Sequence, residues 1–449
     1  MQSPQHLIAK CKNFVREADP IKVYGRVDKG VGLVIEGLGP RANIGDICLI
    51  QPSDLAKDEF VEAEVIGFKE DKILLMPLQE MRGIGPGSRI IARGRQKYVR
   101  VGEEILGRVI DGLGNPMDGK GHINGQLYPI YQEPINPLLR RRITEPLDLG
   151  IRVINSFLTC GKGQRIGIMA GSGVGKSVLL GMMARNTEAD VNVIALIGER
   201  GREVREFIEK DLDEEGLKRS VLVVATSDMS PLARLRGAFL AIAVAEYFRS
   251  IGKNVLFMMD SLTRFAMAQR EIGLAAGEPP TTKGYPPSAF NLLPKLLERA
   301  GNSDGEGTIT GLFTVLVESD DMNDPIADAA RAILDGHIVL SRELANHNHY
   351  PAIDVLQSVS RLMKDIVGDD QRLYVEKVLD VMATYKRYED VITIGAYKEG
   401  TNPKLDFAIG MMEKIRPFLK QRIAEKVTFG EGLAQLRTIF GESASTTRD

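Results

Sequence analysis

The feature that most constrains the fold is a glycine-rich loop that joins an apolar run to a helical one. Residues 166–169 before the loop are apolar, and residues 178–183 after it have helical character. A strand before such a loop and a helix after it are the context that a phosphate-binding P-loop requires. The glycines allow successive backbone N–H groups to point at phosphate oxygens, and the helix N-terminus adds partial positive charge. The loop itself is Ala170-Gly171-Ser172-Gly173-Val174-Gly175-Lys176-Ser177.

Two residue types in this loop have specific tasks in binding a nucleoside triphosphate. Lys176 would neutralise the β- and γ-phosphates, and the Ser177 hydroxyl would ligate Mg²⁺. The strict pattern has glycine where this chain has Ala170, whose methyl group is tolerable if φ is negative there. The alternative is a glycine-rich turn that contains Gly-Lys-Ser by chance. We predict ATP and Mg²⁺ as ligands, with phosphate contacts from Gly171, Ser172, Gly173, Val174, Gly175, Lys176 and Ser177.

The composition is that of a soluble globular protein and excludes several other classes. The 58 basic and 60 acidic residues give a net charge of −2, so no global basic field argues for nucleic-acid binding. No apolar run approaches the roughly 18 residues that span a bilayer, and the N-terminus lacks signal-peptide features. Three scattered cysteines are too few for a disulfide framework or a metal site. These features favour a cytoplasmic enzyme or assembly protein.

Changes in hydrophobic period divide the chain into four predicted segments. Residues 1–20 have the pattern of an amphipathic helix, which either folds back onto its own domain or docks a partner or membrane surface. Residues 21–95 contain six short runs of period two, which favour a small β-barrel because closure removes exposed edges. Residues 96–368 alternate strand and helix, and residues 369–449 lose strand signals and are predicted to be all-helical.

The third segment has the pattern of a parallel α/β domain. Its strand-like runs are continuously apolar and are separated by helical stretches such as 178–186, 203–211 and 231–251, which indicates a sheet covered on both faces. These runs lie at residues 165–170, 192–197, 220–225, 254–260, 310–317 and 337–340. The runs predicted to form the barrel lie at residues 23–27, 33–36, 46–50, 61–66, 73–76 and 88–92.

Two acidic residues end apolar runs of this segment, where ligands bind in an open parallel sheet. Asp260 closes one run and is predicted to hold the Mg²⁺ shell. Its alternative role is that of a helix N-cap, because Ser261 and Thr263 follow it. Glu199 ends another run and could orient and polarise the water that attacks the γ-phosphate. Its alternative is the start of a surface helix with ion pairs.

Several arginines are candidates for stabilising the charge that develops on the transferred phosphoryl group. Arg200 and Arg264 lie just beyond strand ends and could reach the γ-phosphate within one subunit. Arg361 lies far along the chain and is a candidate finger for a neighbouring subunit, its alternative being a surface ion pair. Tyr350 could stack on adenine, although most tyrosines simply pack in the protein.

Taken together, these motifs resemble the catalytic subunit of rotary ATPases and, most closely, the type III protein-export ATPases. The export-type resemblance is carried by residues 197–204, 277–288 and 293–301, and the P-loop is similar to that of the flagellar rather than the injectisome branch. The resemblance covers residues 23–440, nearly the whole chain. The motifs that follow the P-loop in the order of that family are Gly198-Glu199-Arg200, Asp260-Ser261-Leu262-Thr263-Arg264, Tyr350-Pro351-Ala352-Ile353-Asp354 and Ser358-Val359-Ser360-Arg361.

The resemblance implies an α/β fold with a RecA-like P-loop ATPase core, an N-terminal six-stranded β-barrel and a C-terminal helical domain. It implies that Glu199 is the catalytic carboxylate with Arg200 beside it, and that Asp260 lies at the metal. It further implies that Arg264 contacts the γ-phosphate and that Tyr350 faces adenine.

The same resemblance implies a homohexamer in which Arg361 completes the site of a neighbour. The hexamer would act in the cytoplasm, at the inner-membrane base of an export apparatus. Its implied partners are export-gate membrane proteins, export chaperones, cargo proteins and a stator-like regulator on the N-terminal helix. The apolar face formed by Leu7, Ile8 and Phe14 suits that regulator.

Four other functions remain open from the sequence. An ATP-dependent RNA translocase would use the barrel as an oligonucleotide-binding fold, but aromatic residues there are few and acidic ones are frequent. A non-catalytic subunit of a mixed ring is disfavoured because the predicted catalytic residues are intact. A proton- or sodium-driven synthase subunit is disfavoured by residues 277–301. An injectisome-branch secretion ATPase is the fourth possibility.

Overall fold

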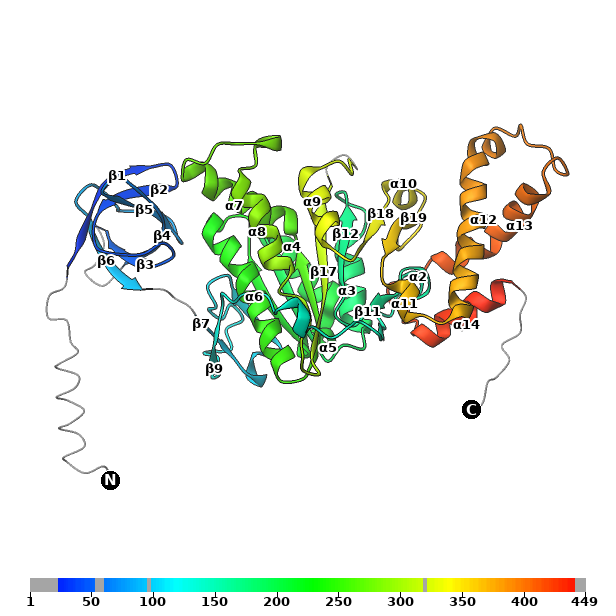
Figure 1. Cartoon of the computed structure of the whole chain (residues 1–449), viewed down its shortest axis with the longest axis horizontal. Coiled ribbons are helices and arrows are strands. Elements are labelled where there is room, and N and C mark those ends of the chain that lie inside the picture. Colours follow the sequence, from blue (N-terminus) through cyan, green and yellow to red (C-terminus); the bar gives the residue numbers. More distant parts are fainter. Residues whose placement is uncertain (1–22, 53–59, 95–97, 318–320, 441–449) are drawn as a thin grey trace, which may run out of the picture. The chain divides into compact units, whose positions relative to one another are not determined.

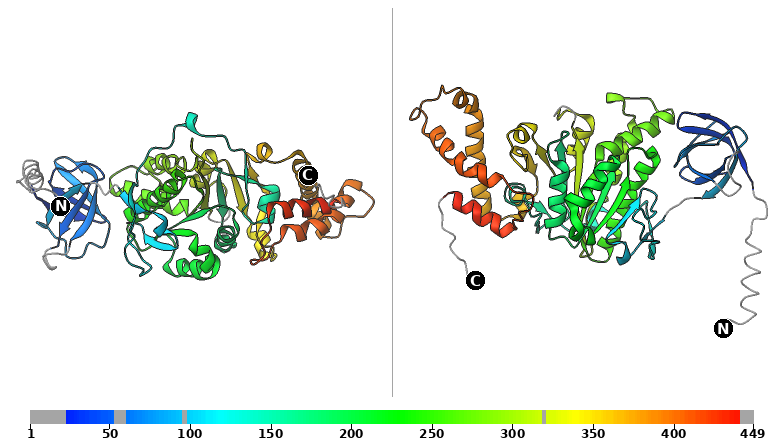
Figure 2. Two further views of the ribbon diagram at one scale, coloured as in Figure 1. Left: turned by 90° about the horizontal axis from the view of Figure 1, so that it is seen from below. Right: turned by 180° about the vertical axis from the view of Figure 1, so that it is seen from behind.

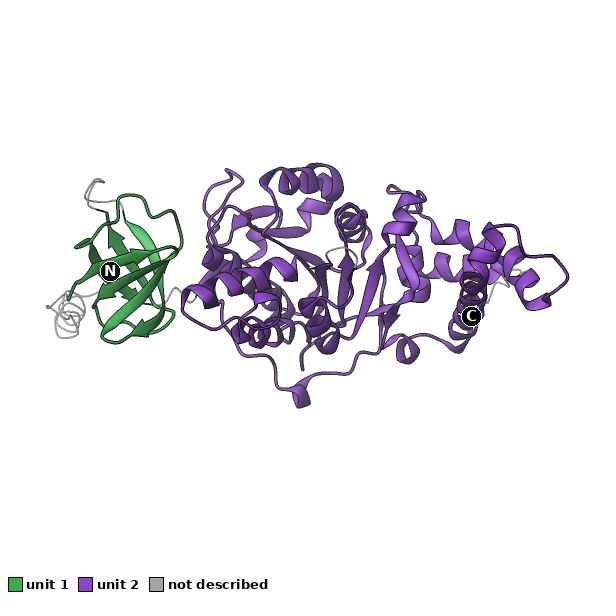
Figure 3. Cartoon of the chain, turned by 90° about the horizontal axis from the view of Figure 1, so that it is seen from above, with its two compact units in different colours: residues 1–96 green, residues 97–449 purple. Residues whose placement is uncertain are grey.

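The computed structural model describes residues 23–52, 60–94, 98–317 and 321–440 (Figure 1). The chain forms two compact units, residues 1–96 and residues 97–449 (Figure 3). The amphipathic helix predicted for residues 1–20 lies outside the described residues.

The first unit contains a closed barrel in which every neighbouring pair of strands is antiparallel. The order around the barrel is β1-β2-β5-β4-β3-β6. Alternate side chains point inward and form the core, which includes Ile35, Ile50, Val65, Leu75 and Ile90. The six-stranded barrel predicted from the period-two runs is therefore confirmed. Its strands are β1 (Gly25–Val31), β2 (Val34–Leu38), β3 (Ile47–Gln51), β4 (Val61–Lys69), β5 (Lys72–Pro77) and β6 (Arg89–Gly94).

The second unit is built on a nine-stranded sheet whose main path runs β19-β18-β12-β17-β15-β13-β14-β8. The strands are parallel except for the edge strand β19 and the short β16, which pairs with β17. Each central strand is almost entirely buried, which is the reason that its sequence is continuously apolar. The strands are β8 (Arg108–Asp111), β12 (Arg165–Ala170), β13 (Val191–Ile197), β14 (Ser220–Ala225), β15 (Asn254–Asp260), β16 (Gly301–Asn302), β17 (Thr308–Leu316), β18 (Gly336–Leu340) and β19 (Ile353–Ser360).

Helices cover both faces of this sheet, as the alternating pattern predicts (Figures 1 and 2). Side chains of one face pack against α6 (Pro231–Ser250), α7 (Leu262–Ala275), α8 (Pro287–Leu297) and α9 (Pro325–Ile333). The other face packs against a second set of elements and continues into the C-terminal helices. This set includes α2 (Arg152–Phe157), α3 (Lys176–Asn186) and α4 (Gly201–Glu206).

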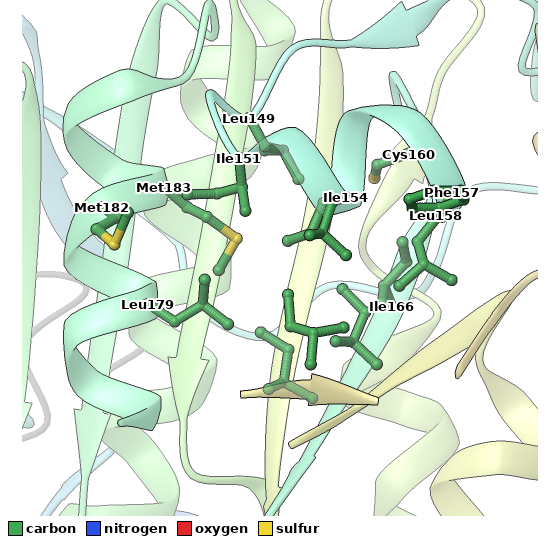
Figure 4. Close-up of a cluster of buried hydrophobic side chains, with 14 of the residues drawn as sticks. Leu149, Ile151, Ile154, Phe157, Leu158, Cys160, Ile166, Leu179, Met182 and Met183 are labelled. Carbon is green, nitrogen blue, oxygen red and sulfur yellow. The ribbon is translucent and has the colours of Figure 1, made fainter. Parts of the chain in front are cut away.

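Figure 4 shows part of this second cluster, in which side chains of α2 and α3 meet over the sheet. Leu179 and Met183 extend from α3, and Ile154 and Phe157 extend from α2. All four are at most 4% exposed. The helix that follows the P-loop is thus anchored by its buried face, so the loop begins and ends on rigid elements.

The C-terminal region is helical, as predicted, and buried polar side chains join it to α2. Its main helices are α12 (Asp369–Thr393), α13 (Pro403–Leu419) and α14 (Phe429–Ile439). The amide of Gln371 on α12 lies 2.9 Å from the carbonyl oxygen of Ser156. The Gln421 side chain accepts a hydrogen bond of 2.7 Å from the backbone N–H of Arg152. None of the helices within the described ranges has the length and apolar character that crossing a bilayer requires.

The structure differs from the sequence prediction in the stretch before the first central strand. The predicted strand-like runs of this segment begin only at residue 165, but the structure has three earlier strands. They are β7 (Tyr98–Val101), β9 (Gln126–Pro129) and β8, which pairs with β14. A strand of four residues carries too little periodicity to be recognised, and its conformation depends on its partner strand.

The remaining short elements connect these layers. They are η1 (Glu103–Ile105), η2 (Pro137–Leu139), β10 (Pro146–Leu147), β11 (Cys160–Gly161), η3 (Phe207–Leu212), α5 (Asp213–Lys218), η4 (Thr282–Gly284), α10 (Arg342–Asn346) and α11 (Met363–Ile366).

Candidate active site

The P-loop lies between the end of β12 and the start of α3, at the carboxyl edge of the sheet. Gly173 has φ of 78° and Gly175 has φ of 86°, a left-handed conformation that favours glycine. Ala170 is a buried residue of β12 that pairs with both Leu316 and Leu340. Ala170 is not one of the described non-glycine residues that have a positive φ. Its methyl group, which departs from the strict P-loop pattern, is therefore accommodated on extended backbone.

Lys176 lies between the two predicted carboxylates. Its Nζ is 2.5 Å from Oδ1 of Asp260 and 3.8 Å from Oε1 of Glu199. The two acids come together because β13 and β15 are parallel neighbours, with Leu196 paired to Asp260. Asp260 is only 4% exposed, and its Oδ1 also accepts a hydrogen bond of 2.7 Å from the Thr314 hydroxyl. This buried carboxylate is thus compensated by a cation and a hydroxyl donor.

The helix N-cap role considered for Asp260 belongs to its neighbour Ser261. The Ser261 hydroxyl accepts a hydrogen bond of 3.3 Å from the backbone N–H of Arg264 and caps α7. The Asp260 carboxylate is directed at Lys176 and Thr314. The structure therefore places Asp260 beside the P-loop lysine, where the metal hypothesis requires it.

The Glu199 carboxyl has an unusual protonation equilibrium. Burial raises its pKa to about 7, the negative charge of Asp260 contributes to the increase, and the positive charge of Lys176 opposes it. A carboxyl group with a pKa near neutrality suits general-base chemistry, because it is a stronger proton acceptor than an ordinary carboxylate and is still ionised in a substantial fraction of molecules near neutral pH. Perturbed pKa values of this kind concentrate at functional sites.

A cavity of about 840 Å³ opens beside these groups. Its lining includes the P-loop residues Gly171, Ser172, Gly173, Gly175, Lys176 and Ser177, together with Glu199 and two of the predicted arginines, Arg200 and Arg264. Val174, also predicted to contact phosphate, does not line the cavity and is buried in the hydrophobic core. Gly198 makes this arrangement possible: its φ is 73°, and a β-carbon there would lie 2.7 Å from Cβ of Arg264. The buried Nε of Arg264 has no hydrogen-bond partner within the described part of the chain. Arg200 has a side chain 76% exposed and lies 3.5 Å from Glu203.

Tyr350 lies close to the P-loop but does not line this cavity among the described residues. A β-carbon on Gly175 would lie 3.4 Å from Cε1 of the Tyr350 ring, which is therefore against the loop. The carbonyl oxygen of Tyr350 accepts a hydrogen bond of 3.0 Å from the backbone N–H of Gln421. The predicted adenine contact is thus near the site, at the junction with the C-terminal region.

Arg361 is the predicted residue that the structure does not bring to the P-loop of its own chain. In the antiparallel pairing of β18 and β19, Leu340 faces Ile353 at the P-loop edge and Gly336 faces Ser360 at the other end. Arg361 directly follows Ser360, so it lies at the end of the strands opposite to the P-loop. It is exposed there and donates a hydrogen bond of 2.9 Å to the carbonyl oxygen of Arg331.

Two polar contacts of the site are absent from the sequence prediction. Thr314 approaches Asp260 because β17 lies between β12 and β15, and this strand order cannot be obtained from local patterns. Arg342 lines the cavity and donates a hydrogen bond of 3.1 Å to the carbonyl oxygen of Ser172. Its only sequence signal is a position just after an apolar run, which many surface arginines share.

A P-loop, acidic residues at the ends of other strands of the same sheet and a parallel sheet covered by helices define a P-loop nucleotide-binding protein. Two family models match the chain. Residues 150–360 match the nucleotide-binding domain of the ATP synthase alpha/beta family, and residues 367–438 match the T3SS EscN ATPase C-terminal domain.

Relatives match nearly the full length. The chain is 54% identical to the flagellum-specific ATP synthase of Bacillus subtilis over 95% of this chain and 97% of that protein. It is 50% identical to a type 3 secretion system ATPase of Xanthomonas euvesicatoria, over 94% and 95% respectively. The assembled ATPase EscN of enteropathogenic E. coli matches with a TM-score of 0.87 and 45% identity, over 92% of this chain and 99% of that chain. The chain therefore belongs to the family of flagellum-specific and type III secretion ATPases, and it is an ATP-hydrolysing enzyme.

Replacing Glu199 by glutamine tests its predicted role as the base. Glu199→Gln keeps the shape and removes the proton acceptor, so we expect Mg-ATP binding to stay within about threefold and turnover to fall by roughly 10²–10⁴. Glu206→Gln is the matched control, because Glu206 lines the same cavity but pairs with Arg202. Binding by calorimetry and steady-state phosphate release provide the measurements. Turnover like that of the wild type in Glu199→Gln would exclude the role.

The pH dependence of activity provides a second test of Glu199. A base is active when deprotonated, so kcat/KM for Mg-ATP should fall as pH drops through about 7, the pKa of Glu199, by about tenfold per unit below it. The residual activity of Glu199→Gln should lack this inflection. The measurement uses saturating Mg²⁺ so that the substrate remains fully complexed, and an inflection retained in Glu199→Gln would assign it to another group.

Proposed function

We propose that this chain is the motor of a flagellar export apparatus, in which hydrolysis of Mg-ATP drives unfolding and export of proteins through a type III secretion channel. The observation that carries the proposal is the placement of Lys176 between Asp260 and Glu199 at the P-loop cavity. The flagellar assignment is supported by relatives named flagellum-specific ATP synthase at 54%, 50% and 50% identity. An injectisome-branch secretion ATPase is the second candidate, supported by the 50% identity to the Xanthomonas euvesicatoria protein.

The chemistry follows from the positions of the charged side chains. The P-loop N–H groups and Lys176 would bind the phosphates, which fixes the γ-phosphate beside Glu199. Glu199 would orient the attacking water and accept its proton, which its raised pKa permits. Arg264, whose Nε is buried without a partner in the described structure, would stabilise charge on the transferred phosphoryl group together with Arg200.

The residues beside the P-loop fit Mg²⁺, which prefers oxygen ligands. Ser177 lines the cavity and would provide its hydroxyl, while Asp260 would provide a carboxylate. The bound metal would supply charge neutralisation to the phosphates. The adenine would lie against Tyr350, whose ring borders Gly175.

The position of Arg361 supports action across a subunit interface. It is exposed at the sheet edge opposite the P-loop, so it can reach a triphosphate only in another copy of the chain. The related EscN structures are described as assembled, and one contains a central stalk, EscO. We therefore propose a homohexamer in which Arg361 of each copy completes the site of the next.

The remaining assignments follow from the same family. We propose that the enzyme acts in the cytoplasm, peripherally at the inner-membrane base of the apparatus, with export-gate proteins, chaperones and cargo as partners. A stator-like regulator would bind residues 1–20. We expect no nucleic-acid partner, given the net charge of −2. The division into segments 1–20, 21–95, 96–368 and 369–449 is proposed as the domain organisation.

Mixing two inactive variants tests the shared site. Arg361→Ala should bind nucleotide nearly normally and lose roughly three to five decades of turnover, while Lys176→Ala lacks the phosphate contact. In mixed oligomers about a quarter of the interfaces regain both groups, so activity should return when the two proteins are combined. Wild-type activity should also rise with protein concentration. Arg387→Ala, at another exposed arginine, serves as the control. No recovery on mixing and no concentration dependence would argue for sites within single chains.

Export in cells tests the flagellar assignment. We expect this chain to restore secretion of flagellar filament protein in a Bacillus subtilis strain that lacks its own relative, and Lys176→Ala to abolish the restoration. Immunoblots of secreted filament protein and swimming assays provide the measurement. Restoration of an injectisome strain but not of the flagellar strain would favour the second candidate.

A further inference from the structure

A third arginine, Arg342, lies beside the P-loop and belongs to none of the sequence motifs discussed above. Arg342 is the first residue of α10, which begins directly after β18. The last residue of β18, Leu340, pairs with Ala170 at the start of the P-loop. This register brings Arg342 beside the loop, where its Nη1 donates a hydrogen bond of 3.1 Å to the carbonyl oxygen of Ser172.

Arg342 lines two cavities. One is the cavity of about 840 Å³ that the P-loop and Glu199 line. The other, of about 230 Å³, lies at the ends of β12, β17 and β18 and is lined by Ala170, Val317 and Leu340 among others. Arg342 belongs to the lining of both, so it contacts the P-loop on the border of the nucleotide site.

The Ser172 carbonyl group lies in a part of the P-loop that has few neighbouring atoms among the described residues. Gly173, the next residue, has φ of 78°, and a β-carbon there would have no described heavy atom within 4 Å. The Ser172 carbonyl and the Gly173 N–H share one planar trans peptide and point in opposite directions. A guanidinium that holds the carbonyl therefore also sets the direction of the N–H. Since P-loop amides bind phosphate only when they point at it, this bond affects the binding geometry.

A salt bridge from Glu343, the residue next to Arg342, connects α10 to α12. Glu343 Oε1 lies 3.4 Å from Nζ of Lys386 on α12, and Lys386 also pairs with Glu389. Exposed pairs of this kind contribute little stability. The stronger anchor is the hydrogen bond from the Gln421 N–H to the Tyr350 carbonyl, in the segment that follows α10. Arg342 thus extends from a segment that the C-terminal region holds in place.

We infer that Arg342 is a positioning residue that orients the Ser172–Gly173 peptide of the P-loop for phosphate binding. This inference rests on the proposed function of the P-loop site. The bond is to the protein backbone and not to the terminal phosphate, so it supports binding of the α- and β-phosphates that ADP and ATP share. The chemical step, which depends on Glu199 and Lys176, is affected much less.

Nucleotide affinities of Arg342 variants test the inference. For Arg342→Ala we expect the dissociation constants of Mg-ADP and Mg-ATP to rise together, each roughly tenfold, because a charge-assisted hydrogen bond is lost. The KM for ATP should rise similarly, while kcat at saturation stays within about threefold. Arg342→Lys should recover part of the affinity, because a single carbonyl needs one charged donor rather than a planar fork. Calorimetry and steady-state kinetics provide these values.

Controls separate this role from two others. Glu343→Gln, on the same helix, removes the contact with Lys386 and should leave both dissociation constants within twofold. A loss of ATP affinity with unchanged ADP affinity would overturn the inference and indicate a γ-phosphate contact. Unchanged affinities for both nucleotides in folded Arg342→Ala and Arg342→Lys would also overturn it. Failure of the wild type to bind nucleotide would instead overturn the proposed function, so the two failures are distinguishable.

Discussion

The site depends on one buried electrostatic arrangement, in which the Lys176 ammonium lies between the carboxylates of Asp260 and Glu199. Charges buried from water are tolerated only when they are paired or hydrogen-bonded. Lys176 comes from the start of α3, and the acids come from the ends of β15 and β13. The pairing therefore requires that three elements meet at one edge of the sheet.

The same electrostatics explain why the two acids differ. Asp260 is nearly inaccessible but has the closest contact with Lys176 and a hydroxyl donor in Thr314. Glu199 is farther from the ammonium, at 3.8 Å, and burial and Asp260 raise its pKa to about 7. The Asp260 carboxylate is thus compensated by a cation and a hydroxyl donor, whereas the surroundings of Glu199 bring its pKa close to neutrality. Asp260 and Glu199 both end apolar runs in the sequence, and their different surroundings in the fold give the two carboxyl groups different properties.

Much of the architecture was predictable because its determinants are local. The buried strands β12, β14 and β15 follow from continuous apolar runs, and the barrel follows from alternation bounded by glycine and proline. β8 and β19 were not predicted. β8 has only four residues, and the edge strand β19 is partly exposed, so neither has a clear pattern. Their conformation comes from the neighbouring strands with which they pair.

The residues of the candidate site were predictable from the sequence to about the same extent as the architecture. Lys176, Ser177, Glu199 and Asp260 could be identified because a P-loop and strand-end acids have fixed positions relative to their own strands. The choice between Asp260 as ligand and as helix cap could not be made, because both roles occur at the same position in a sequence. The structure shows that Ser261 caps α7 and that the Asp260 carboxylate contacts Lys176 instead.

The amino-acid sequence by itself determined the barrel strands, the central strands of the sheet and the phosphate-binding loop, because these depend on periodicity and on the conformational freedom of glycine. Only the tertiary structure decided which strands are neighbours, and hence that Thr314 meets Asp260 and that Arg342 holds the P-loop. It also decided that Arg361 faces away from the P-loop of its own chain. Residues far apart in the chain meet only through sheet order and helix packing, and local patterns carry no record of either.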